Sequence, residues 1–226
     1  MRRGFKISLE GIDGAGKTTQ LRHVVSHLQD SGFNPMIKPC RNNTNSDELD
    51  GRLLSIIKRD EEMRRYPITD ALAGAARTLY VDEKIINPHL EKGGVVVADR
   101  DIDTAIAYSL PDLQKSYPEV DIDLHVTWML GVYSVRHAMP DLTIYLDIAP
   151  ERALSRALND DIPNERIIFN DQDLVFMQSV QQGYSRLIER SPDRIYPIDV
   201  NDKSIDEVSE EISHHINRFI NRRDLS

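Results

Sequence analysis

The sequence is poor in cysteine and in long apolar runs. Cys40 is the only cysteine among 226 residues, so no disulfide can form within the chain, which suits a reducing compartment. No apolar stretch is long enough to span a bilayer, and none follows Arg2 and Arg3 in the manner of a secretory signal. We therefore expect a cytoplasmic protein without a membrane partner.

Basic residues are also scarce relative to acidic ones. The chain has 28 lysines and arginines against 37 aspartates and glutamates, and the resulting net charge of −9 argues against nucleic acid as a partner. A local basic site for a small anion remains compatible with this balance. The length fits one α/β domain with a sizeable core, and we expect a single domain over residues 1–226.

Residues 11–18 read G-I-D-G-A-G-K-T, a complete phosphate-binding loop of the form G-x-x-x-x-G-K-[ST]. An alternating run at 5–9 predicts a strand before it, and apolar residues at helical spacing over 21–28 predict a helix after it. Such a loop cradles phosphates with backbone N–H groups and the helix N-terminus. We expect seven residues of this region to bind ATP: Asp13, Gly14, Ala15, Gly16, Lys17, Thr18 and Thr19. A glycine-rich turn that matches by chance is the alternative, and the flanking strand and helix disfavour it.

Two side chains of the loop and two at the end of a later apolar run are candidates for phosphoryl-transfer chemistry. Lys17 would reach the β- and γ-phosphates, and the Thr18 hydroxyl would ligate Mg²⁺. Asp99 ends the apolar run, where a carboxylate can hold Mg²⁺ through its waters, and the adjacent Arg100 can bind a second phosphate. The alternative for this pair is an ordinary salt bridge at a strand end.

The rest of the chain alternates between strand and helix patterns. Four further short apolar segments predict strands, at residues 35–38, 94–99, 142–147 and 194–199. Helical stretches separate them, and this order predicts an α/β protein with a five-stranded parallel sheet, right-handed crossovers and helices on both faces. Ser204 and Glu207 have the spacing of a capping box ahead of a predicted helix that reaches Asn221.

These motifs in this order resemble the thymidylate kinases, a family of P-loop nucleoside monophosphate kinases. Besides Arg156, the resemblance rests on segments throughout the sequence, at residues 10–20, 75–77, 97–108, 140–147, 165–167, 183–184 and 194–199. It implies a P-loop NTPase fold with a small lid at about 157–172. It also implies transfer of the γ-phosphoryl of ATP to the 5′-phosphate of dTMP, with Mg²⁺ as a cofactor and a homodimer as the assembly.

The resemblance further implies a role for each matching side chain. Lys17, Asp99 and Arg166 would be catalytic, Thr18 and Asp99 would hold the metal, and Arg156 would add a cation for ATP. The acceptor nucleotide would contact six residues: Asp13, Arg41, Arg77, Arg100, Thr104 and Tyr108.

Alternatives stay open for several of these residues. Arg77 is alternatively part of a surface ion pair, Arg156 a solvated helix arginine, and Tyr108 a packed helix tyrosine. Gly14 stands where one branch of the family carries an arginine in the loop, and this favours the lid residue Arg166 as the cation that covers the phosphates in this chain.

The acceptor half departs from the family pattern at four places. Ala73 stands where an aromatic residue usually stacks on thymine, and residues 39–44 replace an Arg-Glu-Pro-Gly-Gly segment. Asp101 replaces an aromatic residue or histidine, and two family arginines of a later helix are replaced by Ser179 and Gln181. Two alternatives to dTMP phosphorylation therefore stay open: a kinase with another acceptor, such as a modified pyrimidine nucleotide, and a nucleotide-binding module without catalysis.

One apolar segment has two interpretations. Residues 110–138 include Trp128, Met129, Leu130, Val132 and Val135. Such a segment is typical either of a core or of a contact between subunits.

Overall fold

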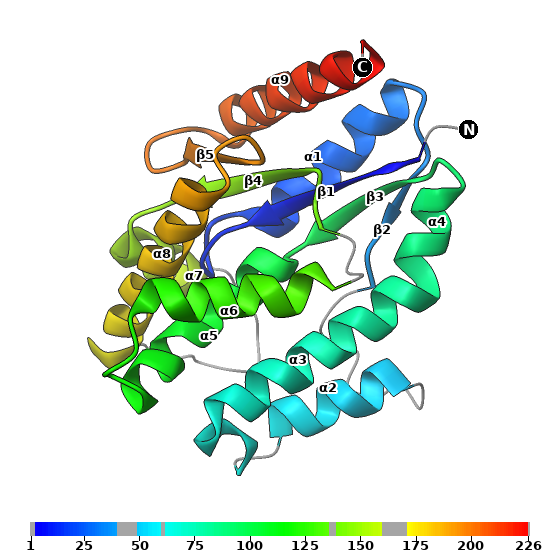
Figure 1. Cartoon of the computed structure of the whole chain (residues 1–226). Helices are drawn as coiled ribbons and strands as arrows, with labels where there is room; N and C mark the ends of the chain where they lie inside the picture. Colours follow the sequence, from blue (N-terminus) through cyan, green and yellow to red (C-terminus); the bar gives the residue numbers. More distant parts are fainter. Residues whose placement is uncertain (1–2, 40–48, 60–61, 136–138, 160–170, 226) are drawn as a thin grey trace.

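The computed structural model describes residues 3–39, 49–59, 62–135, 139–159 and 171–225 (Figure 1). Its centre is a five-stranded sheet in the order β2-β3-β1-β4-β5, and every neighbouring pair is parallel. The strands are β1 Phe5–Glu10, β2 Pro35–Ile37, β3 Val95–Asp99, β4 Leu142–Asp147 and β5 Ile195–Asp199. The predicted α/β architecture with five parallel strands is confirmed.

Some predicted strand ends need correction by one residue. β1 continues to Glu10, β2 stops before Lys38, and the strands predicted from Gly94 and Arg194 begin one residue later. Gly94 and Arg194 lie in the preceding turns, because their N–H groups donate to the carbonyls of His89 and Ser191 at 3.0 and 3.1 Å.

Helices cover both faces of the sheet (Figure 1). Those of the first half are α1 Lys17–Asp30, α2 Leu49–Arg59, α3 Pro67–Val81, α4 Asn87–Glu91 and α5 Ile102–Ser116, with a 3₁₀ turn η1 at Met63–Arg65 and a π-helical turn η2 at Asp82–Ile86. Those of the second half are α6 Ile122–Ser134, α7 Pro150–Asn159, α8 Asp171–Arg190 and α9 Ile205–Asp224. α1 and α9 pack together on one face, whereas α3, α5, α6 and α8 lie on the other.

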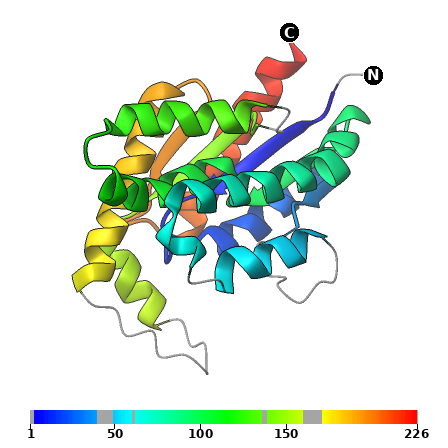
Figure 2. The ribbon, with the colours of Figure 1, turned by 60° about the horizontal axis from the view of Figure 1, so that its bottom comes forward.

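Two further helices, α2 and α7, stand beside this central body. α2 packs on α3, and α7 packs on α8 (Figure 2). The predicted lid at about 157–172 lies mostly outside the described residues, with only the ends of α7 and α8 inside them.

The start of α9 has the predicted capping box. The Ser204 hydroxyl accepts a bond of 3.2 Å from the Glu207 N–H, and the Glu207 carboxylate accepts one of 2.8 Å from the Ser204 N–H. This satisfies two backbone donors that a helix start otherwise leaves open. The helix ends at Asp224, three residues beyond the predicted Asn221.

Several apolar residues of the segment at 110–138 contribute to the core. Val126, Met129 and Tyr133 of α6 are buried, and Trp128 packs against the same cluster. Val135, by contrast, is 62% exposed, so a part of the segment faces away from this core. The homodimer remains a prediction. Among the residues described, the structure holds no helix with the length and apolar character needed to traverse a bilayer.

Candidate active site

The phosphate loop joins β1 to α1 and is shaped by its glycines. Gly14 has a φ of 82°, in the left-handed region that favours glycine. A Cβ atom at this position would lie 2.2 Å from the carbonyl oxygen of Ala153 in α7. The close approach of α7 therefore excludes any side chain here, which gives a structural reason for the absence of an arginine from the loop.

The loop encloses its own lysine. Only 6% of Lys17 is exposed, and its ammonium group donates a hydrogen bond of 2.8 Å to the carbonyl of Ile12. Burial, together with the neighbouring Arg100 guanidinium, lowers the pKa of Lys17 to about 8. The cation is thus held inside the loop, where phosphates would meet it.

Thr18 and Asp99 lie together, as the strand order requires. β1 and β3 are parallel neighbours with Leu9 opposite Asp99, so the loop after β1 and the end of β3 share one edge of the sheet. The Thr18 hydroxyl donates to an Asp99 carboxylate oxygen at 3.1 Å. Hydroxyl, carboxylate and water oxygens are the ligands that Mg²⁺ prefers, so these two side chains fit that ion.

A second cluster, of Asp13, Arg100 and Tyr108, lies next to the loop. The Arg100 guanidinium donates to the carboxylate of Asp13 and, at 2.9 Å, to the carbonyl of Gly11. It also lies over the Tyr108 ring, 5.1 Å from the ring centroid. Burial raises the pKa of Tyr108 to about 12, so its hydroxyl stays protonated, 3.4 Å from Asp13. Tyr108 is therefore both a packed helix residue and a contact of the Asp13–Arg100 pair.

Two cavities adjoin at this cluster. The larger, of about 780 Å³, is lined by the loop residues 13–19 together with Asp99, Arg100 and Arg156. The smaller, of about 420 Å³, is lined by Arg77, Thr104 and Tyr108. Asp13 and Arg100 line both cavities and so stand at the boundary between them. We call the larger one the donor cavity and the smaller one the acceptor cavity.

The arginines predicted from sequence have different surroundings. Arg77 is only 6% exposed; it donates to the backbone carbonyl of Asp50 at 3.3 Å and lies 4.0 Å from the Asp50 carboxylate. The ion pair considered for Arg77 is therefore present, but it is mostly buried and does not lie on the surface. Arg156 reaches from α7 to the carbonyl of Val200 at 3.1 Å, on the wall of the donor cavity. Arg41 and Arg166 lie outside the described residues.

Thr104 lines the acceptor cavity, but its hydroxyl is already bonded to buried groups of the protein. That hydroxyl bonds to the buried carboxylate of Glu10 and lies 2.7 Å from the Tyr184 hydroxyl. Ser8 donates to the same carboxylate at 2.5 Å. Burial raises the pKa of Glu10, and the nearby carboxylate of Asp103 adds to this effect.

The acceptor cavity is bounded by small residues of α3. Ala71 and Gly74 line it. Ala73 does not line it, although it stands four residues before Arg77, where the family usually carries the aromatic residue that stacks on thymine. Among the described residues, a Cβ atom on Gly74 would have only the Tyr133 hydroxyl within 4 Å, at 3.9 Å. The wall therefore has space at Gly74, one residue along the helix from the predicted position.

Several lining residues were not expected from the sequence. The donor cavity also includes Gln20, Val200, Lys203, Ser204, Ile205 and Val208, and the acceptor cavity includes Leu54, Ile57, Asp70, Ala105, Ser109 and Tyr133. They come together through packing between elements far apart in the chain, since α9 packs on α1, and α3 packs against α2, α5 and α6. The substituted positions Ser179 and Gln181 line neither cavity, and Gln181 donates instead to the Asp147 carboxylate at 2.9 Å.

Comparison with known proteins identifies the family. A sequence model of the family described as thymidylate kinase matches residues 9–212. A thymidylate kinase of Caldanaerobacter subterraneus subsp. tengcongensis is 32% identical over 87% of this chain and 88% of its own length. Thymidylate kinases of an Exiguobacterium species and of Clostridium novyi are each 31% identical, over 92% and 94% of this chain and 92% and 98% of their own lengths. Its phosphate loop lines one cavity, and that cavity adjoins a second one lined by arginines. Together with these matches, this shows that the chain belongs to the thymidylate kinase family.

Proposed function

We propose that this protein transfers the γ-phosphoryl group of ATP to dTMP, giving ADP and dTDP. The observation that carries the proposal is the pair of adjoining cavities that share Asp13 and Arg100 at their boundary. Phosphoryl transfer requires two anionic substrates to meet in line, with cations at the phosphates. The relatives' names, each of them thymidylate kinase, supply the identity of the acceptor.

In the donor cavity, Lys17 binds the β- and γ-phosphates of ATP and stabilises charge on the transferred group. Its bond to Ile12 is exchanged for the phosphate oxygens when ATP enters the loop. Thr18 and Asp99 hold Mg²⁺, which when bound offsets charge on the phosphates. Arg156 lines the same cavity. Arg166, in the proposed lid, adds a further cation for the ATP phosphates.

In the acceptor cavity, Arg100 and Arg77 bind the 5′-phosphate of dTMP, and Arg41 adds a third cation. Asp13, between the two substrates, orients Arg100 through their ion pair. Thr104 and Tyr108 form the wall of the cavity. We further propose a cytoplasmic enzyme of one domain, residues 1–226, that acts as a homodimer.

An acceptor other than dTMP is the second candidate. The small residues Ala71, Gly74 and Ala105 leave room in the cavity, and Asp70 supplies an acceptor of hydrogen bonds there. These features favour a base larger than thymine, or one that carries an amino group. A module without catalysis is disfavoured because Lys17 and the Thr18–Asp99 pair are in place.

The test is an ADP-release assay with Mg-ATP and a panel of seven acceptors: dTMP, dUMP, dCMP, dGMP, dAMP, UMP and CMP. A clear preference for dTMP supports the proposal, and efficient turnover of another member supports the second candidate instead. The variant Arg100→Ala should raise the KM for the acceptor much more than the KM for ATP. Equal effects on both KM values would contradict the role given to Arg100.

A further inference from the structure

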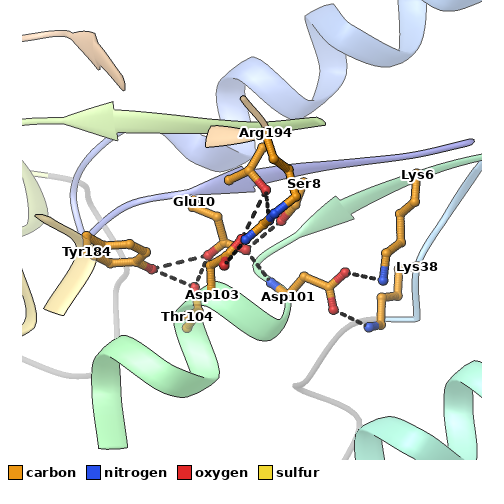
Figure 3. A network of polar contacts seen from close by, with 10 residues as sticks. Lys6, Ser8, Glu10, Lys38, Asp101, Asp103, Thr104, Tyr184 and Arg194 are labelled. Carbon is orange, nitrogen blue, oxygen red and sulfur yellow. Dashed lines mark hydrogen bonds and ion pairs between the residues drawn. The ribbon is translucent and has the colours of Figure 1, made fainter. Parts of the chain in front are cut away.

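The starting point is the polar face of β1. Alternate residues Lys6, Ser8 and Glu10 point to the side opposite the apolar Phe5, Ile7 and Leu9, yet all six residues are buried. A buried charge is stable only with a partner. Figure 3 shows that the partners come from the turn after β3, from the start of α5 and, through Tyr184, from α8.

Asp101 is the residue that pairs with the lysines. Its two carboxylate oxygens each lie 2.5 Å from an ammonium group, one of Lys6 and one of Lys38 (Figure 3). β3 lies between β1 and β2 in the sheet, so Asp101, two residues after β3, connects the strands on either side of it. We call these three residues the lysine bridge. Asp101 precedes α5 at the cap position, but its side chain makes no capping bond there.

The lysine bridge directly follows a strained turn. Arg100 has a φ of 66°, and among the described residues no other non-glycine residue has a positive φ. Such a conformation persists only where the surroundings hold it on both sides. On one side the Arg100 N–H donates to the Leu9 carbonyl at 3.0 Å. On the other, the Asp101 N–H donates to Glu10 at 2.7 Å while its carboxylate is held by the two lysines.

Lys38 also reaches a second element of the acceptor site. Its ammonium group lies 3.4 Å from the Asp82 carboxylate. Asp82 opens the π-helical turn directly after α3, the helix that carries Arg77. A small cavity of about 10 Å³ has Lys38 and Asp101 on its wall together with Arg77 and Arg100. Through Asp101 and Asp82, Lys38 thus connects the turn that holds Arg100 with the end of the helix that carries Arg77.

We propose that Lys6, Lys38 and Asp101 are positioning residues for the acceptor nucleotide. Their bridge holds the left-handed turn at Arg100 and sets the spacing between Arg100 and Arg77. The inference rests on the proposed function, in which these two arginines bind the acceptor's 5′-phosphate. It gives a role to Asp101, which stands where an aromatic residue or histidine is usual.

The test compares a charge-unbalanced variant with a balanced one. Asp101→Asn leaves the two lysines with one carboxylate fewer, so this variant can lose stability. Lys6→Met/Asp101→Asn removes one charge of each sign and retains the Lys38–Asp82 pair. The double variant should fold, and its KM for the acceptor should rise about tenfold while its KM for ATP stays within about twofold of the wild type. Ile216→Val changes a buried residue of α9 and serves as a control for a general loss of stability. It should leave the KM for the acceptor and the KM for ATP unchanged.

A second measurement does not depend on turnover. Hydrogen exchange of the amides of residues 100–104, without nucleotide, should be at least about tenfold faster in the double variant, and exchange in α9 should be unchanged. Unchanged exchange at 100–104 would overturn the proposal, as would a folded double variant whose two KM values match the wild type or rise equally. If wild-type protein phosphorylates no member of the acceptor panel, the proposed function fails, and the exchange data still decide whether the bridge holds the turn.

Discussion

The Lys17 ammonium group is bonded to the Ile12 carbonyl at 2.8 Å, inside the loop that it serves. Because burial and the Arg100 guanidinium lower its pKa to about 8, about half of the nucleotide-free molecules have a neutral Lys17 at pH 8. Anionic phosphates next to the amine favour the charged form and raise this pKa again. Nucleotide binding is therefore linked to the protonation of Lys17.

We predict that ADP binding at pH 8 takes up about half a proton, and that ADP affinity falls as the pH rises above 8. Isothermal titration calorimetry in two buffers of different ionisation enthalpy measures this uptake directly. In Lys17→Arg the guanidinium stays charged at this pH, so the uptake should disappear even where binding is weaker. Equal heats in the two buffers for the wild-type protein would show that Lys17 is already charged at pH 8.

The Thr18–Asp99 contact predicts how the enzyme depends on magnesium. Thr18→Val keeps the shape of the side chain but removes the hydroxyl, so the Mg²⁺ concentration for half-maximal activity should rise about tenfold or more. Thr18→Ser retains the hydroxyl and should remain within about threefold of the wild type. A Thr18→Val enzyme with unchanged Mg²⁺ dependence would mean that this hydroxyl is not a ligand.

The parts of the structure that were predictable are those that depend on local pattern. The phosphate loop is a contiguous motif, and the short apolar strands are separated by helical periodicity along the chain. The meeting of Thr18 with Asp99 follows from these elements alone, because parallel strands bring their carboxyl ends to one edge of the sheet.

The parts that were not predictable depend on packing between distant elements. β1 alternates between apolar and polar residues, a pattern typical of a half-exposed strand, yet both of its faces are buried. Lys6 on its polar face finds its partner in Asp101 of the turn after β3, and Glu10 accepts from Thr104 of α5 and Tyr184 of α8. Likewise, counting from Arg77 points to Ala73, whereas the cavity is lined by Gly74, since one residue turns the helix by about 100°.

Gly74 predicts a change in which stability and acceptor binding move in opposite directions. Gly74→Ala should stabilise α3 by about 0.5–1 kcal/mol, because in the part of the chain that the structure describes the added Cβ meets only the Tyr133 hydroxyl, at 3.9 Å. The same methyl group enters the acceptor cavity and should raise the KM for the acceptor by about tenfold. Thermal unfolding and steady-state kinetics measure the two effects.

A matched control for this substitution exists in α6. Gly131 is also inside a helix, a Cβ atom added to it would have no neighbour within 4 Å among the described residues, and it lines neither cavity. Gly131→Ala should give a similar gain in stability with no change in either KM. If Gly74→Ala leaves the acceptor KM unchanged, the acceptor does not reach the wall of the cavity at α3.

The lysine bridge predicts a specific loss of stability in acid. Burial opposes ionisation of Asp101, but Lys38 and Lys6 outweigh it and lower the pKa of Asp101 from its ordinary value of 3.8 to about 2. As the pH falls, Asp101 is protonated in the unfolded chain before it is protonated in the folded protein. The stabilisation from the ionised Asp101 is therefore complete above about pH 5 and is lost as the pH falls toward 2. Between pH 5 and pH 3 the free energy of unfolding of the wild type should therefore fall by about 1 kcal/mol more than that of Lys6→Met/Asp101→Asn. Urea unfolding at the two pH values tests this difference.

Equal losses in the two proteins would mean that Asp101 titrates alike in the folded and unfolded chain, and would remove the electrostatic basis of the bridge.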